Sequence, residues 1–393
     1  MVPAIRFKGF NDAWEQNVLG AIGELKNGMN FGKDAMGHGY PFVNLQDVFG
    51  KNIVNDTNLG LAVSNENQRK EYSLEKGDIL FIRSSVKPEG VGETALVEKK
   101  LENTTYSGFI IRFRANIEMN DSFKRIVFSI TGIRKQILSN ATSSANTNIN
   151  QDSIKKIQLQ LPNIDEQTQI GSYFQRFDKL ISLHQAKVNK LVNLKKAMLE
   201  KMFPKDGADV PEIRFKGFEE AWEDRAVNTI ADRYDNLRIP ITASDRVAGD
   251  TPYYGANGIQ DYVSGYTHDG EFILIAEDGA NDLKNYPVQY VYGQIWVNNH
   301  AHVLQAKNKI TCNIFLKYAF SQVNIEPFLV GGGRAKLNAE TMMNIEISVP
   351  LNINEQEKIG TYFQNLDKLI TLHQSELDKL NNLTKACLEK MFV

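Results

Sequence analysis

The stretch "HQAKVNKLVNLKKAMLEKMF" (residues 184–203) returns later in the chain as "HQSELDKLNNLTKACLEKMF" (373–392). The likeness extends upstream, so that residues 166–203 and 355–392 are identical at 25 of 38 positions with an offset of 189. Neither copy contains a proline or a turn-forming cluster, and both carry apolar residues at helical spacing. The sequence therefore predicts the same long helix twice.

Each long helix is preceded by a second repeated element. Residues 2–15, "VPAIRFKGFNDAWE", match residues 210–223, "VPEIRFKGFEEAWE", at 11 of 14 positions with an offset of 208. The chain is thus a tandem repeat of two units, about 2–203 and 210–392, and the first holds 19 extra residues because 208 − 189 = 19. Two similar frames around dissimilar middles favour a scaffold that carries two different binding heads. The alternative is a plain duplication with drifted loops.

The predicted helices have one apolar stripe each. In the first copy, residues spaced by seven form it, namely Ile170, Phe177, His184, Leu191 and Met198. Asn163 with Glu166, and Asn352 with Glu355, make the Asn-x-x-Glu pattern of a helix start. A helix of this size spans ~57 Å at ~1.5 Å per residue, too long to cover one small core. We expect the two helices to pair as an antiparallel coiled-coil spacer; the alternative is that each packs on its own domain.

Composition is that of a globular protein, with 42% hydrophobic and 23% charged residues and a formal net charge of −2. The chain has no apolar run approaching the ~18 residues that a membrane span requires, and its first residues lack a signal-peptide core. Cys312 and Cys387 are not spaced as metal ligands or a redox pair. These features predict a cytoplasmic protein without a metal site.

The two middles differ in sequence but both contain short strand-like runs separated by glycine and amide clusters. The fold class predicted is α+β, with two mainly β or α+β domains in tandem, two long antiparallel helices and an internal pseudo-two-fold repeat. The boundaries expected are 1–161 for the first head, 162–204 for the first helix, 205–349 for the second head and 350–393 for the second helix.

In the first middle, "DSFKRIVFSITGIRK" (121–135) has a helical pattern with Lys124, Arg125, Arg134 and Lys135 off its apolar face. A polar loop, "SNATSSANTNIN" (139–150), follows. Cations, hydroxyls and amides beside a helix end suit contacts to phosphates and base edges, and they equally suit a solvated loop.

In the second middle, aromatic and amide residues alternate with glycine turns, as in base-reading loops and in sugar-binding loops. His300 and His302 point the same way on a strand, but without an evident third ligand a structural pair is favoured over a metal site. Asp78, Glu98 and Lys100 form a loose version of a metal-dependent nuclease pattern. A phosphate-binding loop and a Gly-x-Ser-x-Gly elbow are both missing from the sequence.

The whole chain resembles the specificity subunit of type I restriction–modification systems. The resemblance rests on the "IRFKGF…AWE" lead-ins, the "LPNIDEQTQIGSYF" run that opens a long helix, and the "LEKMF" helix end. Insert text such as "GDILFIRSS" and "GQIWVNNHAHVL" also looks like target-recognition domains of that family.

The resemblance implies a non-catalytic subunit that binds double-stranded DNA. Each head would read one half of a bipartite site, and the helices would set the gap between the halves. The expected partners are two methyltransferase subunits and an ATP-dependent restriction and translocation subunit. S-adenosylmethionine, ATP and Mg²⁺ would reside on those partners and no cofactor on this chain. The net charge of −2 departs from a basic DNA-binding surface, so the partners would supply part of the phosphate neutralisation.

Polar residues at strand ends and in loops are the candidates for DNA contact. They are Asn44, Gln46, Arg83, Ser84, Ser143, Ser144 and Asn148 in the first head and Tyr254, Asn257, Asn281, Asn299, Arg334 and Lys336 in the second. Trp14 and Trp222 are candidates for partner docking, or else anchor their lead-ins to the local core. The competing functions are a stand-alone metal-dependent nuclease and a two-headed carbohydrate- or protein-binding scaffold.

Overall fold

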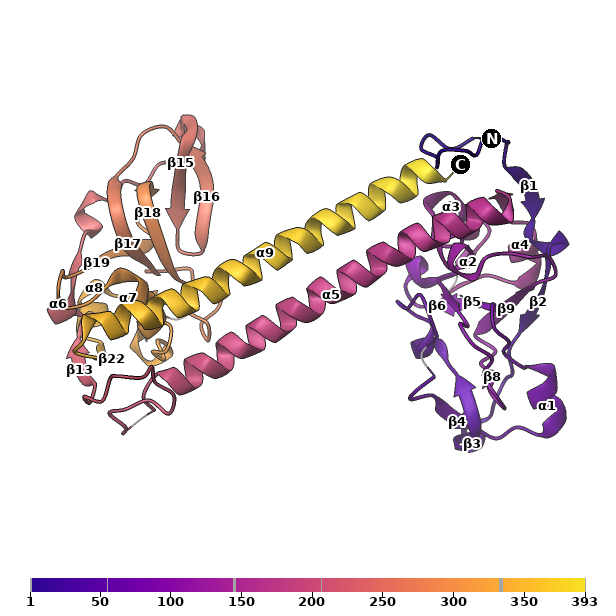
Figure 1. Ribbon diagram of the computed structural model, residues 1–393, viewed down its shortest axis with the longest axis horizontal. Coiled ribbons are helices and arrows are strands. Elements are labelled where there is room, and N and C mark those ends of the chain that lie inside the picture. Colours follow the sequence, from indigo (N-terminus) through magenta and orange to yellow (C-terminus); the bar gives the residue numbers. More distant parts are fainter. Residues whose placement is uncertain (1, 55, 144–145, 206, 332–334, 393) are drawn as a thin grey trace. The chain divides into compact units, whose positions relative to one another are not determined.

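The computed structural model describes residues 2–54, 56–143, 146–205, 207–331 and 335–392. The chain divides into two compact units. The first comprises residues 1–184 and 376–393, and the second comprises residues 185–375. Each unit therefore contains one head together with one part of each long helix, and each is described in turn below (Figure 1).

The first head is built on an antiparallel four-stranded sheet that has a hydrophobic core on each face. Its strand order is β2 (Gly23–Asn27), β9 (Ile110–Ala115), β5 (Ile79–Ile82) and β7 (Thr94–Leu96). Two three-stranded sheets flank it: β4 (Gly60–Ala62), β3 (Met36–Val43) and β8 (Thr105–Tyr106), and then β10 (Thr142–Ser143), β11 (Thr147–Asn148) and β6 (Ser84–Ser85). All four residues of β5 are buried, which fits its uninterrupted apolar sequence "ILFI".

The helices of the first head are short: α1 (Glu66–Glu71), α2 (Asp121–Val127), α3 (Thr131–Ser139) and α4 (Gln151–Lys155). The helical stretch expected over 121–135 is two helices, α2 and α3. Ser129 accounts for the break, because its backbone N–H and its hydroxyl both bond the carbonyl of Ile126 at 2.9 and 2.8 Å. These bonds compete with continuation of the helix.

The second head has a different architecture, a six-stranded sheet. Its order is β14 (Ala231–Arg233), β19 (Ala301–Ala306), β17 (His268–Ala276), β18 (Val288–Val297), β15 (Ala248–Gly255) and β16 (Gly258–Val263). The β15–β18 pair is parallel and the other pairs are antiparallel. Smaller elements complete it: α6 (Val227–Ile230), α7 (Asn313–Phe320), α8 (Ala339–Met343), β20 (Leu329–Val330) and β21 (Lys336–Leu337). Different sheets explain why the two middles do not align.

Both heads are closed at their base by the same antiparallel ribbon. In the first unit β1 (Glu15–Val18) pairs with β12 (Gln158–Leu161), and in the second β13 (Glu223–Ala226) pairs with β22 (Glu346–Val349). The registers correspond, since the first strand begins opposite the last residue of its partner in each case. Each ribbon leads directly into a long helix.

The long helices are α5 (Ile164–Met202) and α9 (Ile353–Met391), with 39 residues each. Asn163 caps α5 as the sequence predicts, because its Oδ1 accepts from the N–H of Glu166 at 2.9 Å. Asn352 caps α9 differently and accepts from Asn354 at 3.0 Å.

The two long helices run antiparallel within each unit. In the first unit Tyr173 Oη lies 3.6 Å from Cys387 Sγ, and in the second Lys195 Nζ lies 2.6 Å from Asp367 Oδ1. In the second unit Phe203, eight residues after Lys195, packs on Phe363, four residues before Asp367, so the residue number on α9 falls as that on α5 rises. In the first unit the start of α5 lies beside the end of α9, which fits the same direction. The antiparallel pairing predicted from the sequence is confirmed inside each unit.

A cluster of four aromatic rings joins the frame of each unit. In the first unit Phe392, at the end of α9, contacts three rings of the first repeat, with centroid distances of 5.9 Å to Trp14, 5.8 Å to Phe123 and 6.2 Å to Phe174. The second unit repeats this cluster with Phe203 packed on Trp222, Phe315 and Phe363 at 5.7, 5.8 and 6.2 Å. Each repeat therefore inserts its last phenylalanine into the core of the other repeat.

The lead-ins hold this arrangement with equivalent polar contacts. Arg6 makes a two-pronged ion pair with Glu166 at 2.6 and 2.7 Å, and Arg214 does the same with Glu355 at 2.6 and 2.8 Å. The Ile5 N–H donates to the last turn of α9 at 2.9 Å, and the Ile213 N–H donates to the last turn of α5 at 2.9 Å. The internal repeat inferred from the sequence is thus also a repeat of contacts.

Candidate functional site

Three of the polar residues proposed for the first head lie in one small sheet. Ser84 of β6 stands opposite Asn148 of β11, and the carbonyl of Arg83 accepts from the N–H of Ile149 at 2.9 Å. The Arg83 guanidinium donates to the carbonyl of Gly108 at 3.2 Å, which directs it along the rim of the head. Ser143 ends β10 in the same sheet, while its side chain and all of Ser144 lie outside the described residues.

Asn44 and Gln46 belong to a short 3₁₀ turn, η3 (Leu45–Asp47), at which Gln46 is exposed. The Asn44 side chain accepts from the N–H of Leu45 at 2.8 Å and so has a local capping role. The turn lies close to the small sheet, because a Cβ placed on Gly90 would meet both Phe49 at 2.6 Å and the Ser85 hydroxyl at 2.5 Å. The candidates of the first head therefore form one neighbourhood.

Two apolar residues of this neighbourhood escaped the sequence analysis, Val86 and Phe109. Both are large and exposed, and they adjoin Arg83: Val86 follows β6, and the carbonyl of Phe109 accepts from the Arg83 N–H at 2.8 Å. The signal for Phe109 was the turn "SGF" before a buried strand, which places an apolar side chain at the strand end. Exposed apolar groups beside an arginine fit contact with a thymine methyl group or a sugar.

Three of the four cations expected on the surface of 121–135 have structural roles instead, and the fourth, Lys135, is exposed as predicted. Lys124 is buried and donates to the carbonyl of Gly77 at 2.6 Å, Arg125 pairs with Asp178 of α5, and Arg134 donates to the carbonyl of Val91 at 2.7 Å. Burial holds the pKa of Arg134 below its usual value. These residues tie the helices to the head and are not free for phosphate contact.

In the second head, three candidates come together at the turn between β15 and β16. The Asn257 amide donates to the carbonyl of Gly279 at 2.9 Å and accepts from the N–H of Asn281 at 2.9 Å. The carbonyl of Tyr254 accepts from the N–H of Asn298 at 3.0 Å. Burial, with Tyr262 nearby, raises the pKa of Tyr254, so its hydroxyl stays neutral and able to donate.

Lys336 belongs to a charged network beside this turn. Its Nζ lies 2.8 Å from one oxygen of Glu277, and Arg238 lies 2.6 Å from the other. The hydrogen bond to Glu277 raises the pKa of Lys336. Burial alone would raise the pKa of Glu277, but the two cations outweigh it and leave that pKa lowered. Arg238 also lies 3.5 Å from the carbonyl of Asn299, so Asn299 adjoins the network, and Arg334 lies outside the described residues.

Among the described residues, one cluster has the ligand types of a metal site: Asp235, Glu277 and His302. Asp235 and Glu277 therefore supply, beside His302, the further ligand types that the sequence analysis did not identify. However, Arg238 and Lys336 occupy both oxygens of Glu277, and His300 pairs with Asp278 at 2.5 Å instead of joining the cluster. Two bound cations disfavour a divalent ion here, so the structural interpretation of these histidines stands.

The nuclease pattern has no support in the geometry of Asp78. Its buried carboxylate accepts two bonds from Arg114, at 2.8 and 2.7 Å, and one from the N–H of Glu75 at 2.7 Å. Lys100 is exposed and lies near Glu75 and Glu102 at 3.8 and 3.5 Å. Asp78 thus caps a turn and pairs with an arginine of β9.

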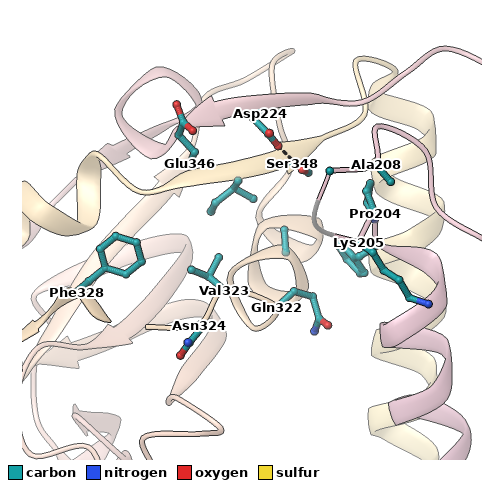
Figure 2. A pocket seen from close by; sticks show the side chains of 14 residues that line it. Pro204, Lys205, Ala208, Asp224, Gln322, Val323, Asn324, Phe328, Glu346 and Ser348 are labelled. Atoms are coloured by element: carbon teal, nitrogen blue, oxygen red, sulfur yellow. Dashed lines mark hydrogen bonds between the residues drawn. The ribbon is translucent and has the colours of Figure 1, made fainter. Parts of the chain in front are cut away.

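A cavity of about 440 Å³ lies in the second unit, and its lining does not include the turn between β15 and β16. Figure 2 shows the segment that carries Pro204, Lys205 and Ala208 on one side of it and Gln322 and Val323 on the other. The strands β13 and β22 provide the remaining wall. Its polar groups do not form a nucleophile and base pair, and it adjoins the frame rather than the candidate residues.

Trp14 and Trp222 are each only 4% exposed. Trp14 also donates its indole N–H to Glu166 at 3.2 Å. Both rings are members of the aromatic clusters described above, which agrees with the alternative that they anchor the lead-ins. Their indole faces are covered and not available to a partner.

The long helices, in contrast, expose leucines at equivalent positions of the two repeats. In the first unit these are Leu180, Leu183 and Leu383, and in the second Leu369, Leu372 and Leu194, all between 40% and 53% exposed. Position 180 lies roughly abreast of position 383, and 369 abreast of 194, by the antiparallel register. Each unit therefore exposes an equivalent set of three leucines, which we call the leucine patch.

These features define a class of protein: a duplicated helical frame that carries two unlike recognition heads. A family model described as the type I restriction modification DNA specificity domain matches residues 11–193 and again residues 219–382. The chain belongs to this family, with one copy in each repeat, and its role is DNA sequence specificity rather than catalysis. No helix among the described residues combines the length and the apolar character that a membrane span demands.

Individual relatives agree. A protein described as a type I restriction enzyme specificity subunit of Haemophilus influenzae is 47% identical over 135 residues, which are 34% of each chain, so that match spans about a third of the relative. The type I restriction enzyme MjaX specificity subunit of Methanocaldococcus jannaschii is 25% identical over 95% of this chain and 91% of its own. The crystal structure of the type I S subunit from M. genitalium has the same fold, with a TM-score of 0.71, 17% identity and coverage of 100% of this chain and 99% of the other.

Proposed function

We propose that this chain directs a type I restriction–modification complex to a bipartite DNA site. The first head, within residues 1–161, reads one half of the site, and the second, within residues 205–349, reads the other. The helical segments, within 162–204 and 350–393, set the gap between them. The observation that carries this proposal is that one frame is built twice with the same contacts and holds two unlike heads.

The residues of each neighbourhood have the chemistry of base readout. Arg83 and Arg334 pair with guanine, whose O6 and N7 accept from a guanidinium fork, and Asn and Gln side chains pair with adenine. Asn44, Gln46, Ser84, Ser143, Ser144 and Asn148 complete the first head, and Tyr254, Asn257, Asn281, Asn299 and Lys336 the second. Neighbouring Val86 and Phe109 add apolar contacts in the first head.

The partners are double-stranded DNA, two methyltransferase subunits, and an ATP-dependent restriction and translocation subunit, all cytoplasmic. We assign methyltransferase docking to the leucine patch, one subunit on each copy. Its occurrence in both units at equivalent positions is what two identical partners require, and such exposed apolar patches mark interaction sites. We assign S-adenosylmethionine, ATP and Mg²⁺ to those partners, as the resemblance to the family implies.

The test is to co-express the chain with a methyltransferase subunit from the same locus and to map methylated adenines across the host DNA by single-molecule sequencing. We expect a two-part motif with a fixed unspecified gap that appears only when this chain is present. Arg83→Ala is expected to lower the discrimination between bases at one position of one half-site by about 1–3 kcal/mol, and to leave discrimination at the other half-site unchanged. A stable complex that methylates without any motif would contradict the proposal.

A further inference from the structure

His302 of β19 is a buried junction between separate segments of the second head. Its ring is 1% exposed, its Nδ1 lies 2.7 Å from Asp235, and its Nε2 lies 2.9 Å from the carbonyl of Leu337. Asp235 begins the 3₁₀ turn η5 (Asp235–Leu237), and Leu337 belongs to β21. The imidazole thus connects two loops that are about a hundred residues apart in the sequence.

The Nε2 of His302 acts as a donor. A backbone carbonyl only accepts, so Nε2 carries a hydrogen toward Leu337. Burial is the largest influence on Asp235 and would raise its pKa, but bonds from His302 and the Val303 N–H, with Arg238 nearby, outweigh it and leave that pKa lowered. Asp235 is therefore ionised near neutral pH, and its carboxylate lies 2.7 Å from Nδ1 of His302.

The bond from His302 fixes one side of β21, and Glu277 fixes the other. The N–H of Leu337 donates to the carbonyl of Glu277 at 2.7 Å, while the Leu337 carbonyl receives Nε2 of His302. Lys336, the residue before it, reaches the Glu277 carboxylate at 2.8 Å, and that carboxylate lies 3.6 Å from His302 Nδ1. The position of the Lys336 side chain is consequently coupled to a histidine that is itself inaccessible to DNA.

We propose that His302 is a positioning residue for the specificity of the second head. The inference rests on the proposed function, because it requires that this head read a half-site. Without the ring, β21 loses a backbone bond and Asp235 is left as a buried carboxylate with fewer donors. Lys336 and the neighbouring Asn299 then sample several positions, so discrimination between bases weakens although neither residue has changed.

The experiment compares His302→Leu and His302→Gln with a matched control, His268→Gln. His268 is also a buried histidine of this head, but its ring bonds Thr267 at 2.7 Å and the Tyr234 carbonyl at 3.1 Å rather than β21. Each full-length variant is co-expressed with the methyltransferase subunit. Methylation is then measured on DNA libraries in which one half-site is varied at a time, and thermal unfolding of each purified variant is recorded.

We expect His302→Leu to lower selectivity at the second half-site by about tenfold, the value of one lost base contact, with no change at the first. His302→Gln keeps an N–H for the Leu337 carbonyl but loses the contact with Asp235, so it should lose about threefold in selectivity at the second half-site, the size of one hydrogen bond. His268→Gln should destabilise the fold without a loss of selectivity.

Unchanged selectivity in His302→Leu would overturn the positioning role, and so would an equal loss in His268→Gln at similar stability, since that pattern reports general loosening. If His302→Leu does not fold, the comparison of the two Gln variants decides. Equal selectivity in the two variants would contradict the proposal, whether both stay at the wild-type level or both lose the same amount. A wild-type chain that yields no bipartite motif refutes the proposed function itself, which is a separate outcome.

Discussion

Replacement of Phe392 by alanine tests the idea that each repeat is completed by the end of the other. The ring is 8% exposed and contacts Trp14, Phe123 and Phe174. A buried Phe→Ala change costs about 3–5 kcal/mol, a large part of the ~5–15 kcal/mol that holds a domain folded. At about 2–4 °C per kcal/mol, the first unit should melt roughly 6–20 °C lower.

The assay is tryptophan fluorescence during thermal or urea unfolding. Trp14 lies in the perturbed cluster and Trp222 in the equivalent intact one, while the third tryptophan, Trp296, also lies in the second unit. Trp296→Phe combined with Trp222→Phe therefore leaves only Trp14 to report on the first unit, and combined with Trp14→Phe it leaves only Trp222 to report on the second. Phe203→Ala is the equivalent change in the other cluster and should lower the melting temperature of the second unit by a similar amount. Tyr292→Ala is the control, because that ring is 75% exposed and its loss should cost less than about 0.5 kcal/mol.

A decrease of less than about 1 kcal/mol in the free energy of unfolding of Phe392→Ala would refute the reasoning, because the loss of a ring with three aromatic contacts from a packed core should destabilise the unit by more than this. An effect larger in the Trp222 signal than in the Trp14 signal would also refute it. Either result would mean that the helix end is held elsewhere.

Three further changes test separate parts of the structure. Leu180→Asp together with Leu369→Asp should abolish methyltransferase binding, and either change alone should leave one subunit bound per chain, as measured by light scattering. The melting temperature should not change, because both positions are exposed. Full binding by the double variant would contradict the docking assignment. The lowered pKa values of Asp235 and Glu277 mean that their contribution to stability is present above the usual carboxylate range near pH 4 and is lost as pH falls below it. The free energy of unfolding, followed by circular dichroism, should therefore fall more on acidification in the wild type than in Asp235→Asn, which has one such group fewer; an equal fall in both would contradict this. Gly171→Ala places a Cβ 2.9 Å from the backbone nitrogen of Phe123 and should cost about 1–3 kcal/mol in urea unfolding, whereas a neutral result would show that α2 moves aside freely.

The frame was predictable from the sequence because it rests on local periodicity and on repetition. The long helices begin within two residues of the positions indicated by the capping patterns, at Ile164 and Ile353, and end at Met202 and Met391. Seven-residue spacing of apolar side chains is a property of the chain itself, so it needs no tertiary information. The pairing followed from helix length, which calls for a partner of similar length, and its antiparallel direction from the whole domain that separates the two helices.

The role of individual polar residues was less accessible, because it depends on partners far away in the sequence. Lys124 has the pattern of a surface cation on a helix, yet it bonds a carbonyl 47 residues earlier. The acidic partners of His302 come from 67 and 25 positions before it, Asp235 and Glu277, and neither spacing is a recognisable motif. Tertiary pairings of this kind decide which charges remain available for DNA, and the sequence contains no local sign of them.

The construction of the frame explains how one scaffold accommodates two unlike heads. Each head is an insertion whose two ends meet in an antiparallel ribbon, at Glu15 opposite Leu161 and at Glu223 opposite Val349. Any chain that returns its ends to this register satisfies the ribbon's backbone bonds, whatever sheet lies between. The core of each frame is likewise completed by the partner repeat's terminal phenylalanine and not by the head alone. The contacts that hold the frame are therefore largely separate from the loops that confer specificity, so the heads can differ in sheet order and length while the frame keeps the same geometry.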